Sequence, residues 1–266
     1  MRVYVAGIGV LGPGFQGWAK SAPILRGQMP YIAEPLVLDA PGILSSRERR
    51  RSGPAIRLAL NAAQEAVGQA GIPMPELAAV FGSSAGNSLE IHQILESLAT
   101  PEMLVSPTLF HNSVHNSAVG YWCISTDCHQ PSTSIAGHDF TFPATVLKGV
   151  AQAVTEVRPV LLTVFDSPFP EPLDSKRHLV DAFAVALVFT PRPSAESKFA
   201  MSVCWHHGAR DEYTSSPGLP GVHDLFLGNP AARALPLLEA MAHEKPARVR
   251  LRYPRSGHLD MELSPC

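Results

Sequence analysis

A serine hydroxyl lies at the centre of the segment Gly82-Ser83-Ser84-Ala85-Gly86, which matches the Gly-x-Ser-x-Gly pattern of a nucleophile elbow. The segment follows a predicted strand at 77–81 and precedes a helical pattern at 88–98, which is the context that a serine hydrolase needs. Acidic and histidine residues follow in the order that such a triad requires: Asp166 or Asp211, then His223 or His258. A tight turn rich in Gly and Ser gives the same letters without chemistry. Ser84 is therefore a candidate nucleophile, with an ordinary strand-to-helix turn as the alternative.

Cysteine and histidine residues occur close together at three places: Cys123-x4-Cys128-His129, His206-His207, and His111 with His115. These spacings do not match the usual zinc patterns, and buried cysteines are commonly inert. His111 and His115 also lack the glutamate that a zinc protease places beside its first histidine. The sequence therefore predicts no metal site.

The glycines of Gly7-x-Gly9-x-x-Gly12 match the dinucleotide-binding fingerprint and follow an apolar run at 3–10. That fingerprint works only when a helix begins at once, because the amides of its first turn hold the pyrophosphate. Here Pro13 and Gly14 follow, which is a poor helix start. We therefore expect no nucleotide and no other cofactor.

The 266 residues are 45% hydrophobic, which suffices for a sizeable core. The net charge of −2 argues against nucleic-acid binding. One dense basic run contains Arg47, Arg49, Arg50 and Arg51. It is either the solvated start of a helix or a patch that meets an acidic partner such as a carrier protein.

The amino-terminal apolar run has the character of a buried strand and not of a signal peptide, because no small-residue cleavage site follows it. No stretch reaches the length of a membrane span. The four cysteines form no disulfide framework for a chain of this length. From these features we expect a soluble, cytoplasmic protein.

Apolar patterning predicts strands near 3–10, 77–81, 132–136, 160–165, 183–189, 199–205 and 248–253, and helices near 49–70, 88–98, 111–123, 145–157 and 231–243. Ser88 is a candidate cap for the second helix. Strands and helices alternate over the first 190 residues, which indicates an α/β layered sheet. The strands at 160–165 and 183–189 have no convincing helix between them, so part of the sheet is expected to be antiparallel. A Gly/Pro/Ser-rich segment at 209–223 is the best linker candidate.

Several segments together resemble the β-ketoacyl synthase family in order and spacing: the opening strand and turn at 2–13, the helix and Gly-rich strand end at 49–86, the Ser-Pro stretch at 105–110, the Asn-x-Ala-x-Gly-like stretch at 116–120, and Gln130-Pro131. The resemblance covers about residues 1–190. It implies a thiolase-like layered αβα fold with a mixed sheet, a well-formed N-terminal half and a shortened C-terminal half. The expected portions are 1–195, which is ketosynthase-like, and 196–266, which packs on it.

In that family the nucleophilic cysteine lies eight residues after the proline, on a strand-to-helix turn. The equivalent position after Pro131 is Asp139, and a slip of one residue gives His138. Neither side chain is a thiol, so the resemblance implies no catalytic residue in this chain. The family also uses two histidines from its C-terminal half. His206-His207-Gly208 and Gly257-His258-Leu259 resemble those motifs only faintly.

Some members of this superfamily pair an active ketosynthase with a cysteine-less partner, the chain-length factor, as in type II polyketide and aryl polyene systems. The resemblance thus implies a ketosynthase partner, a heterodimer or larger assembly, and contact with an acyl carrier protein through that complex. Residues expected at the interface or the acyl tunnel are Phe110, Trp122, Ser134, Ile135, His138 and Phe140. The alternative for the apolar members is ordinary core. A structural interaction module without a role in acyl chemistry is a third possibility.

Overall fold

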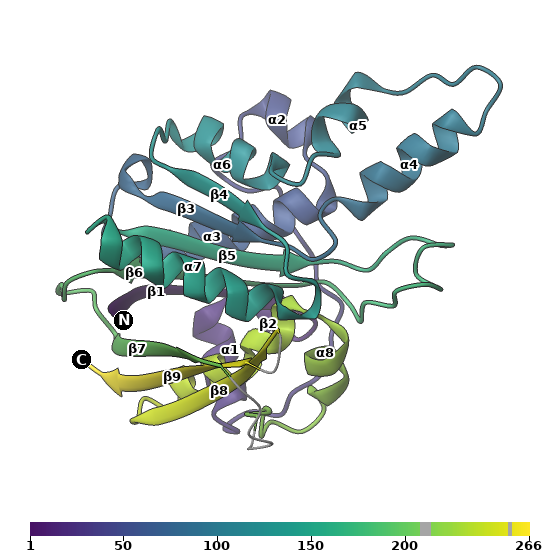
Figure 1. Ribbon diagram of the computed structural model, residues 1–266. Helices are drawn as coiled ribbons and strands as arrows, with labels where there is room; N and C mark the ends of the chain where they lie inside the picture. The colour runs from purple at the N-terminus through teal and green to yellow at the C-terminus, as the bar shows by residue number, and fades with distance from the viewer. Residues whose placement is uncertain (208–213, 255–256) are drawn as a thin grey trace.

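The structure is a computed structural model that describes residues 1–207, 214–254 and 257–266. Its central feature is a mixed sheet with the strand order β4-β3-β5-β6-β1-β7-β9-β8, in which β2 pairs with β1 (Figure 1). The strands are β1 (Arg2–Gly12), β2 (Phe15–Gln16), β3 (Ala78–Gly82), β4 (Ser132–Ile135), β5 (Val160–Asp166), β6 (Phe183–Thr190), β7 (Phe199–His206), β8 (Ala247–Tyr253) and β9 (Gly257–Pro265).

The first part of the sheet combines both strand directions. β3 runs parallel to β4 and β5, whereas β6 is antiparallel to β5 and β1. Its strands β3, β5 and β6 are buried along their whole length, because helices cover both faces. The mixed α/β sheet that the alternation of elements predicts is therefore confirmed, as is the antiparallel pairing of β5 and β6.

The helices are α1 (Trp18–Leu25), α2 (Ser46–Arg51), α3 (Pro54–Ala70), α4 (Ser88–Leu98), α5 (Pro107–Asn112), α6 (Ser117–Thr126), α7 (Thr141–Thr155), α8 (His223–Gly228) and α9 (Leu235–Ala242), with short 3₁₀ turns at Met74–Glu76, His138–Phe140 and Ala231–Ala234. α3 and α6 contribute to one hydrophobic cluster. α1, α7, α8 and α9 contribute to the other. The result is a layered arrangement of helix, sheet and helix.

The C-terminal portion adds the strands β7, β9 and β8, which pair antiparallel and join the sheet where β7 meets β1. α7 contacts both β5 and β8, so it lies between the two parts of the sheet (Figure 1). The inner side chains of these three strands belong to the same hydrophobic cluster as α7. No helix in the described ranges covers their outer face, which is the form that the shortened C-terminal half takes.

Gly7 and Gly9 explain the dinucleotide-like pattern without a nucleotide. A Cβ on Gly7 would overlap the carbonyl oxygen of Ala66, and one on Gly9 would overlap that of Ala62. Both glycines lie inside the long strand β1, and the next helix begins only at Trp18. They let α3 pack directly on the strand, since any side chain would separate the two backbones.

Several predicted boundaries need correction. The helix expected at 49–70 is interrupted, because Ser52 and Gly53 are extended before Pro54 opens α3. The helix expected at 111–123 is two shorter ones, α5 and α6. Ser88 makes no capping hydrogen bond, and the cap position of α4 belongs to Asn87. The linker predicted at 209–223 lies partly outside the described residues, and its described end includes the start of α8.

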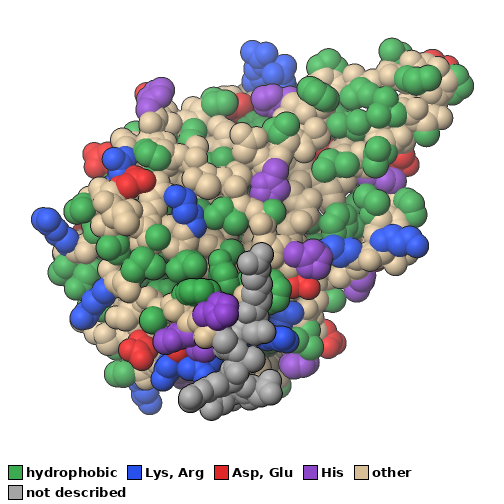
Figure 2. Space-filling view, viewed as in Figure 1, with side chains coloured by type: hydrophobic (Ala, Val, Ile, Leu, Met, Phe, Trp, Pro, Cys, Tyr) green, Lys and Arg blue, Asp and Glu red, His purple; other side chains and the backbone are tan. Residues whose placement is uncertain are grey.

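α4 and α5 form an arm, defined here as residues 88–112, that projects from the body of the molecule (Figure 1). Apolar side chains crowd its surface in the space-filling view (Figure 2). The exposed members include Leu89, Ile91, Leu95, Leu98, Met103, Leu104 and Phe110. None of the helices in the described part of the chain combines the length and the apolar character that crossing a bilayer requires.

Candidate functional site

The three parallel strands β3, β4 and β5 have their carboxyl ends on the same side of the sheet, and these ends bring the sequence motifs together. β3 leads into the Gly82–Gly86 turn, β4 leads into the turn before α7, and β5 ends at Asp166. The Ser83 amide donates to the Ile135 carbonyl at 3.0 Å, which joins the first two turns. Open α/β sheets place their functional residues at the carboxyl ends of their parallel strands.

Asp166 is completely buried beneath the Gly82–Gly86 turn. Its Oδ1 accepts from the hydroxyls of Ser83 and Ser84, both at 3.0 Å, and from the amides of Ser84 and Ala85 at 2.8 and 2.9 Å. Its Oδ2 has no partner among the described residues. Burial raises the pKa of Asp166 to about 6, although the four hydrogen bonds oppose that rise.

Ser84 lacks the base that a serine hydrolase requires. Its hydroxyl donates directly to Asp166, and no histidine in the described ranges hydrogen-bonds to it. The nearby His115 instead contacts the Ser83 carbonyl through Nε2 at 2.8 Å. His223 belongs to α8 and His258 to β9, while Asp211 lies outside the described residues. The Gly-x-Ser-x-Gly match is a structural turn here, since its hydroxyls hold a buried carboxylate.

The turn between β4 and α7 has the geometry of a nucleophile elbow. His138 has φ 53°, a left-handed conformation that is uncommon for a residue with a side chain. Two hydrogen bonds to the first residue of α7 fix this turn: the Gly137 amide donates to the Thr141 hydroxyl, and that hydroxyl donates to the His138 carbonyl at 2.7 Å. We call residues 137–141 the elbow. Such strained strand-to-helix turns present a nucleophile in other enzymes.

The side chains at the elbow are an imidazole and a carboxylate, both exposed. His138 Nδ1 lies 3.2 Å from Asp139 Oδ2, and Arg177 Nη2 lies 3.1 Å from Asp139 Oδ1. None of the four cysteines is at the elbow: Cys123 lies within α6, Cys128 is buried against Leu77, and Cys204 and Cys266 are exposed elsewhere. Burial raises the pKa of the Cys123 thiol, which makes it a poorer nucleophile.

A cavity of about 450 Å³ lies beside the elbow. Asp139, Phe140 and Pro143 form one side, and Arg233 and Arg252 line it from the C-terminal portion. The Arg233 guanidinium lies 4.8 Å from the centre of the Phe226 ring and donates to the Leu227 carbonyl at 2.9 Å. Arg177 and Arg233 give no signal in the sequence, because isolated arginines in a loop and in a short 3₁₀ turn form no pattern. These cations could only have been found from the fold.

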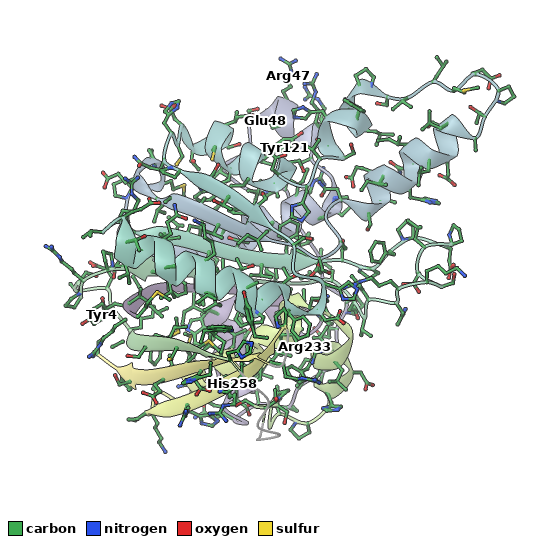
Figure 3. All side chains as sticks on the ribbon, in the orientation of Figure 1. Tyr4, Arg47, Glu48, Tyr121, Arg233 and His258 are labelled. Atoms are coloured by element: carbon green, nitrogen blue, oxygen red, sulfur yellow. The ribbon has the colours of Figure 1, made fainter. Side chains whose placement is uncertain are left out.

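The two histidines with faint family resemblance lie together, but not in that cavity. His206 and His258 stack across β7 and β9 with ring centres 4.8 Å apart, next to Asp260 (Figure 3 labels His258). Their ligand atoms are close enough to surround a metal ion. However, Arg248 and Arg250 already bind both oxygens of Asp260 and hold its pKa well below the usual range. Two guanidinium groups oppose a metal dication, so this cluster is better described as an ion-pair network.

A second cavity, of about 610 Å³, is bounded by α2, α5 and α6. Its apolar part includes Phe110, Tyr121 and Ile124, while Arg47 and Arg51 stand at its rim (Figure 3 labels Arg47, Glu48 and Tyr121). Phe110 is 67% exposed.

The remaining predicted interface residues are in three different settings. Trp122 is fully buried in the hydrophobic cluster of α3 and α6. It is therefore an ordinary core residue, which was the alternative to an interface role. Ser134 and Ile135 lie on β4, the outermost strand at one edge of the sheet. His138 and Phe140 belong to the elbow.

The fold and the elbow define a thiolase-like protein. The sequence profile described as the β-ketoacyl synthase N-terminal domain matches residues 25–222, so the chain belongs to the β-ketoacyl synthase family. No curated protein sequence matches the chain.

Solved ketosynthase structures share the whole fold at low identity. A ketosynthase (ApeO) in complex with its chain length factor (ApeC) from Xenorhabdus doucetiae gives a TM-score of 0.72 at 19% identity, covering 98% of this chain and 99% of that one. The ishigamide ketosynthase/chain length factor gives 0.68 at 15% identity, covering 99% of each chain. A β-ketoacyl synthase from Burkholderia phymatum STM815 gives 0.72 at 10% identity, covering 100% of this chain and 99% of that one. The predicted thiolase-like fold is therefore confirmed.

Proposed function

We propose that this chain is a non-catalytic, chain-length-factor-like subunit that pairs with an active β-ketoacyl synthase. The observation that carries the proposal is the elbow: its strained turn and helix start are kept, but no thiol stands there. Acyl transfer in this family depends on a thiolate nucleophile at such a turn. The fold can therefore provide the architecture of a ketosynthase without its condensation chemistry.

His138 is the better candidate for the former nucleophile position than Asp139, because His138 carries the strained backbone. Neither side chain replaces a cysteine. An acyl group on the carboxylate would be a mixed anhydride, which hydrolyses easily. The imidazole lies against Asp139, and Arg177 holds that carboxylate from the other side. The Asp139 carboxylate is thus occupied by contacts with neighbouring side chains, which supports an elbow without a free nucleophile.

One side of β4 pairs with no strand in the described part of the chain, which supports association with a second sheet. Pro131 and Ile135 direct their carbonyls to β3, so Ser132 and Ser134 direct their backbone groups away from it. An open edge of this kind is a template for pairing with another strand. We assign this edge to the partner ketosynthase, in keeping with the solved complex in which a ketosynthase binds its chain length factor.

The apolar arm and the cavity at α2 support two further contacts. Phe110 is the exposed aromatic residue of the arm, and in this proposal it bounds the acyl tunnel of the pair. Arg47 and Arg51 line an apolar cavity. Two positive charges beside an apolar surface suit an acidic, amphipathic helix of a carrier protein. The acyl product would be of the polyketide or aryl polyene class.

A proline substitution in β4 tests whether this strand pairs with the ketosynthase. Ser134→Pro removes an outward backbone N–H without touching the ladder to β3, whereas Ser134→Ala keeps that donor. Co-expressed with a cysteine-bearing ketosynthase as the candidate partner, the wild-type chain and Ser134→Ala should co-purify with that partner, and Ser134→Pro should not. Circular dichroism of each isolated chain controls for folding. A wild-type chain that remains alone would overturn the proposal, and equal pairing by both variants would exclude the β4 edge.

A further inference from the structure

A small pocket of about 270 Å³ lies at the base of the arm, between the first turns of α3 and α4 and the loop after β5. Pro54 and Ala55 line it from α3, and Ser88 and Glu90 line it from α4. Phe169, between two prolines, closes it from the loop. Its volume is below the range of about 300–1,000 Å³ for small-molecule sites, so it suits a single side chain.

The pocket contains a carboxylate without a counter-charge. Glu90 is only 4% exposed, and its Oε2 has no hydrogen-bond partner in the described part of the chain. The hydroxyl of Ser88, on the same wall, is also buried without a partner. Removing an ionised carboxylate from water costs several kcal/mol unless it is paired. Two unsatisfied polar groups in one pocket therefore indicate a missing donor.

The other carboxylate oxygen of Glu90 is held in place. A Cβ on Gly53 would overlap Glu90 Oε1, so this oxygen lies directly against the residue that precedes α3. The positive end of the α3 dipole favours a negative charge there. That contact fixes the carboxylate at the pocket, but it gives Oε2 no donor.

The walls select the chemistry of the occupant. A planar guanidinium can donate to a carboxylate and a hydroxyl at once, and it is weakly hydrated enough to enter an apolar pocket. Phe169 offers an aromatic ring, and Pro168 and Pro170 offer flat apolar surfaces for its stem. A metal dication would need several more oxygen ligands than these.

We infer that the Glu90 pocket receives an arginine side chain of the partner ketosynthase. This rests on the proposed function, in which the arm bounds the acyl tunnel of the pair, because the pocket lies at the base of that arm. Leu89 lines the pocket and also belongs to the exposed apolar surface of the arm. An arginine enclosed by apolar contacts is a common anchor of protein interfaces.

A guanidinium probe tests the pocket without any partner. Ethylguanidinium chloride should bind the isolated chain, as measured by isothermal titration calorimetry for every variant and, in the wild-type chain, by the ¹³C shift of the Glu90 δ-carboxyl carbon. Ethylammonium chloride at the same ionic strength should bind more weakly. Glu90→Gln should abolish binding, while Glu102→Gln, an exposed glutamate of the same arm, should not change it. Equal or tighter binding of ethylammonium would overturn the arginine assignment, and no binding of either probe would overturn the site.

The melting temperature of Glu90→Gln separates a binding role from a structural one. A buried carboxylate that lacks a donor destabilises the isolated chain. The Tm of the isolated Glu90→Gln chain should therefore equal or exceed that of wild type. A Glu90 that serves only the start of α3 would give a lower Tm.

In the complex, Glu90→Gln should weaken affinity for the ketosynthase about 30-fold. Glu102→Gln should change it by less than about twofold. Unchanged affinity of the Glu90→Gln variant for a ketosynthase that still binds wild type would overturn the inference while leaving the proposed function intact. A wild-type chain that binds no ketosynthase would overturn the proposed function, and the probe titration would still decide the site.

Discussion

Two strand-to-helix turns at one edge of the sheet match patterns that carry nucleophiles in other proteins, and they differ in what they keep. The Gly82–Gly86 turn matches the sequence pattern of a nucleophile elbow, but both of its serine hydroxyls donate hydrogen bonds to the buried Asp166. The elbow has the strained backbone at His138, and its exposed side chains are an imidazole and a carboxylate. In the proposed function, the strained backbone at His138 and not the Gly-x-Ser-x-Gly pattern marks the position that corresponds to the family's nucleophile.

The two turns also differ in how firmly they are held. Asp166 joins the first turn to β5 with four hydrogen bonds inside the core. The elbow is held by one hydroxyl, by the Arg177–Asp139 ion pair and by the contact between His138 and Asp139, all near the surface. Substitutions should therefore cost more at the first turn than at the second.

The pH dependence of stability should show the largest effect. The pKa of Asp166 in the folded protein, about 6, exceeds the ordinary value of 3.8, so folding is favoured by its proton. That contribution is complete below about pH 4 and is lost as the pH rises through 6, on the order of 3 kcal/mol in total. Urea unfolding of wild type and Asp166→Asn should give a free-energy difference that shifts by this amount between pH 4 and pH 7. A constant difference would contradict the raised pKa.

Crowding beneath the first turn gives the next effect. A Cβ on Gly82 would overlap the hydroxyl of Thr145 on α7. Gly82→Ala should lower the free energy of unfolding by about 2 kcal/mol. Thr145→Ala in the same chain should recover part of that loss, as a double-mutant cycle would measure. If the two substitutions simply add, α7 does not press on this turn.

Strain at the elbow predicts a gain in stability. His138→Gly relieves the left-handed conformation and should raise the free energy of unfolding by about 1 kcal/mol. Thr133→Gly on β4 is the matched control, because Thr133 is not left-handed and the same substitution there should only lower stability. A destabilised His138→Gly chain would show that the imidazole contributes more than the strain costs.

The ion pair at the elbow should have the smallest effect. Arg177→Ala removes a contact to the half-exposed carboxylate of Asp139. Exposed pairs of this kind contribute roughly 0.2–1 kcal/mol, and salt weakens them. Chemical denaturation at low and high salt should show a small difference that vanishes at high salt. A loss of several kcal/mol would mean that the elbow is held as firmly as the first turn.

Much of the fold was predictable because its strands are dense in apolar, β-branched residues. β1, β3, β5 and β6 lie where the pattern places them, and α4 matches to the residue. β9 was missed, although Leu259, Met261 and Leu263 alternate with more polar residues and are buried. That period-2 signal was available in the sequence. α1 was missed because Pro23 lies inside it.

The site was predictable only in part. Spacing from Pro131 led to residues 138–139, but the strain that distinguishes His138 from Asp139 is a property of the folded turn. Arg233 and Glu90 gave no signal, because their meaning comes from burial beside segments distant in sequence. Contacts of this kind depend on tertiary packing and not on local pattern.

The most direct test of the central claim is the product formed by the pair. The cysteine-bearing ketosynthase and its acyl carrier protein would be supplied with starter and extender units, with and without this chain, and products measured by mass spectrometry. We predict that this chain alone forms no product, and that adding it to the ketosynthase changes product length or yield. Condensation by this chain alone, or an unchanged product, would contradict the account.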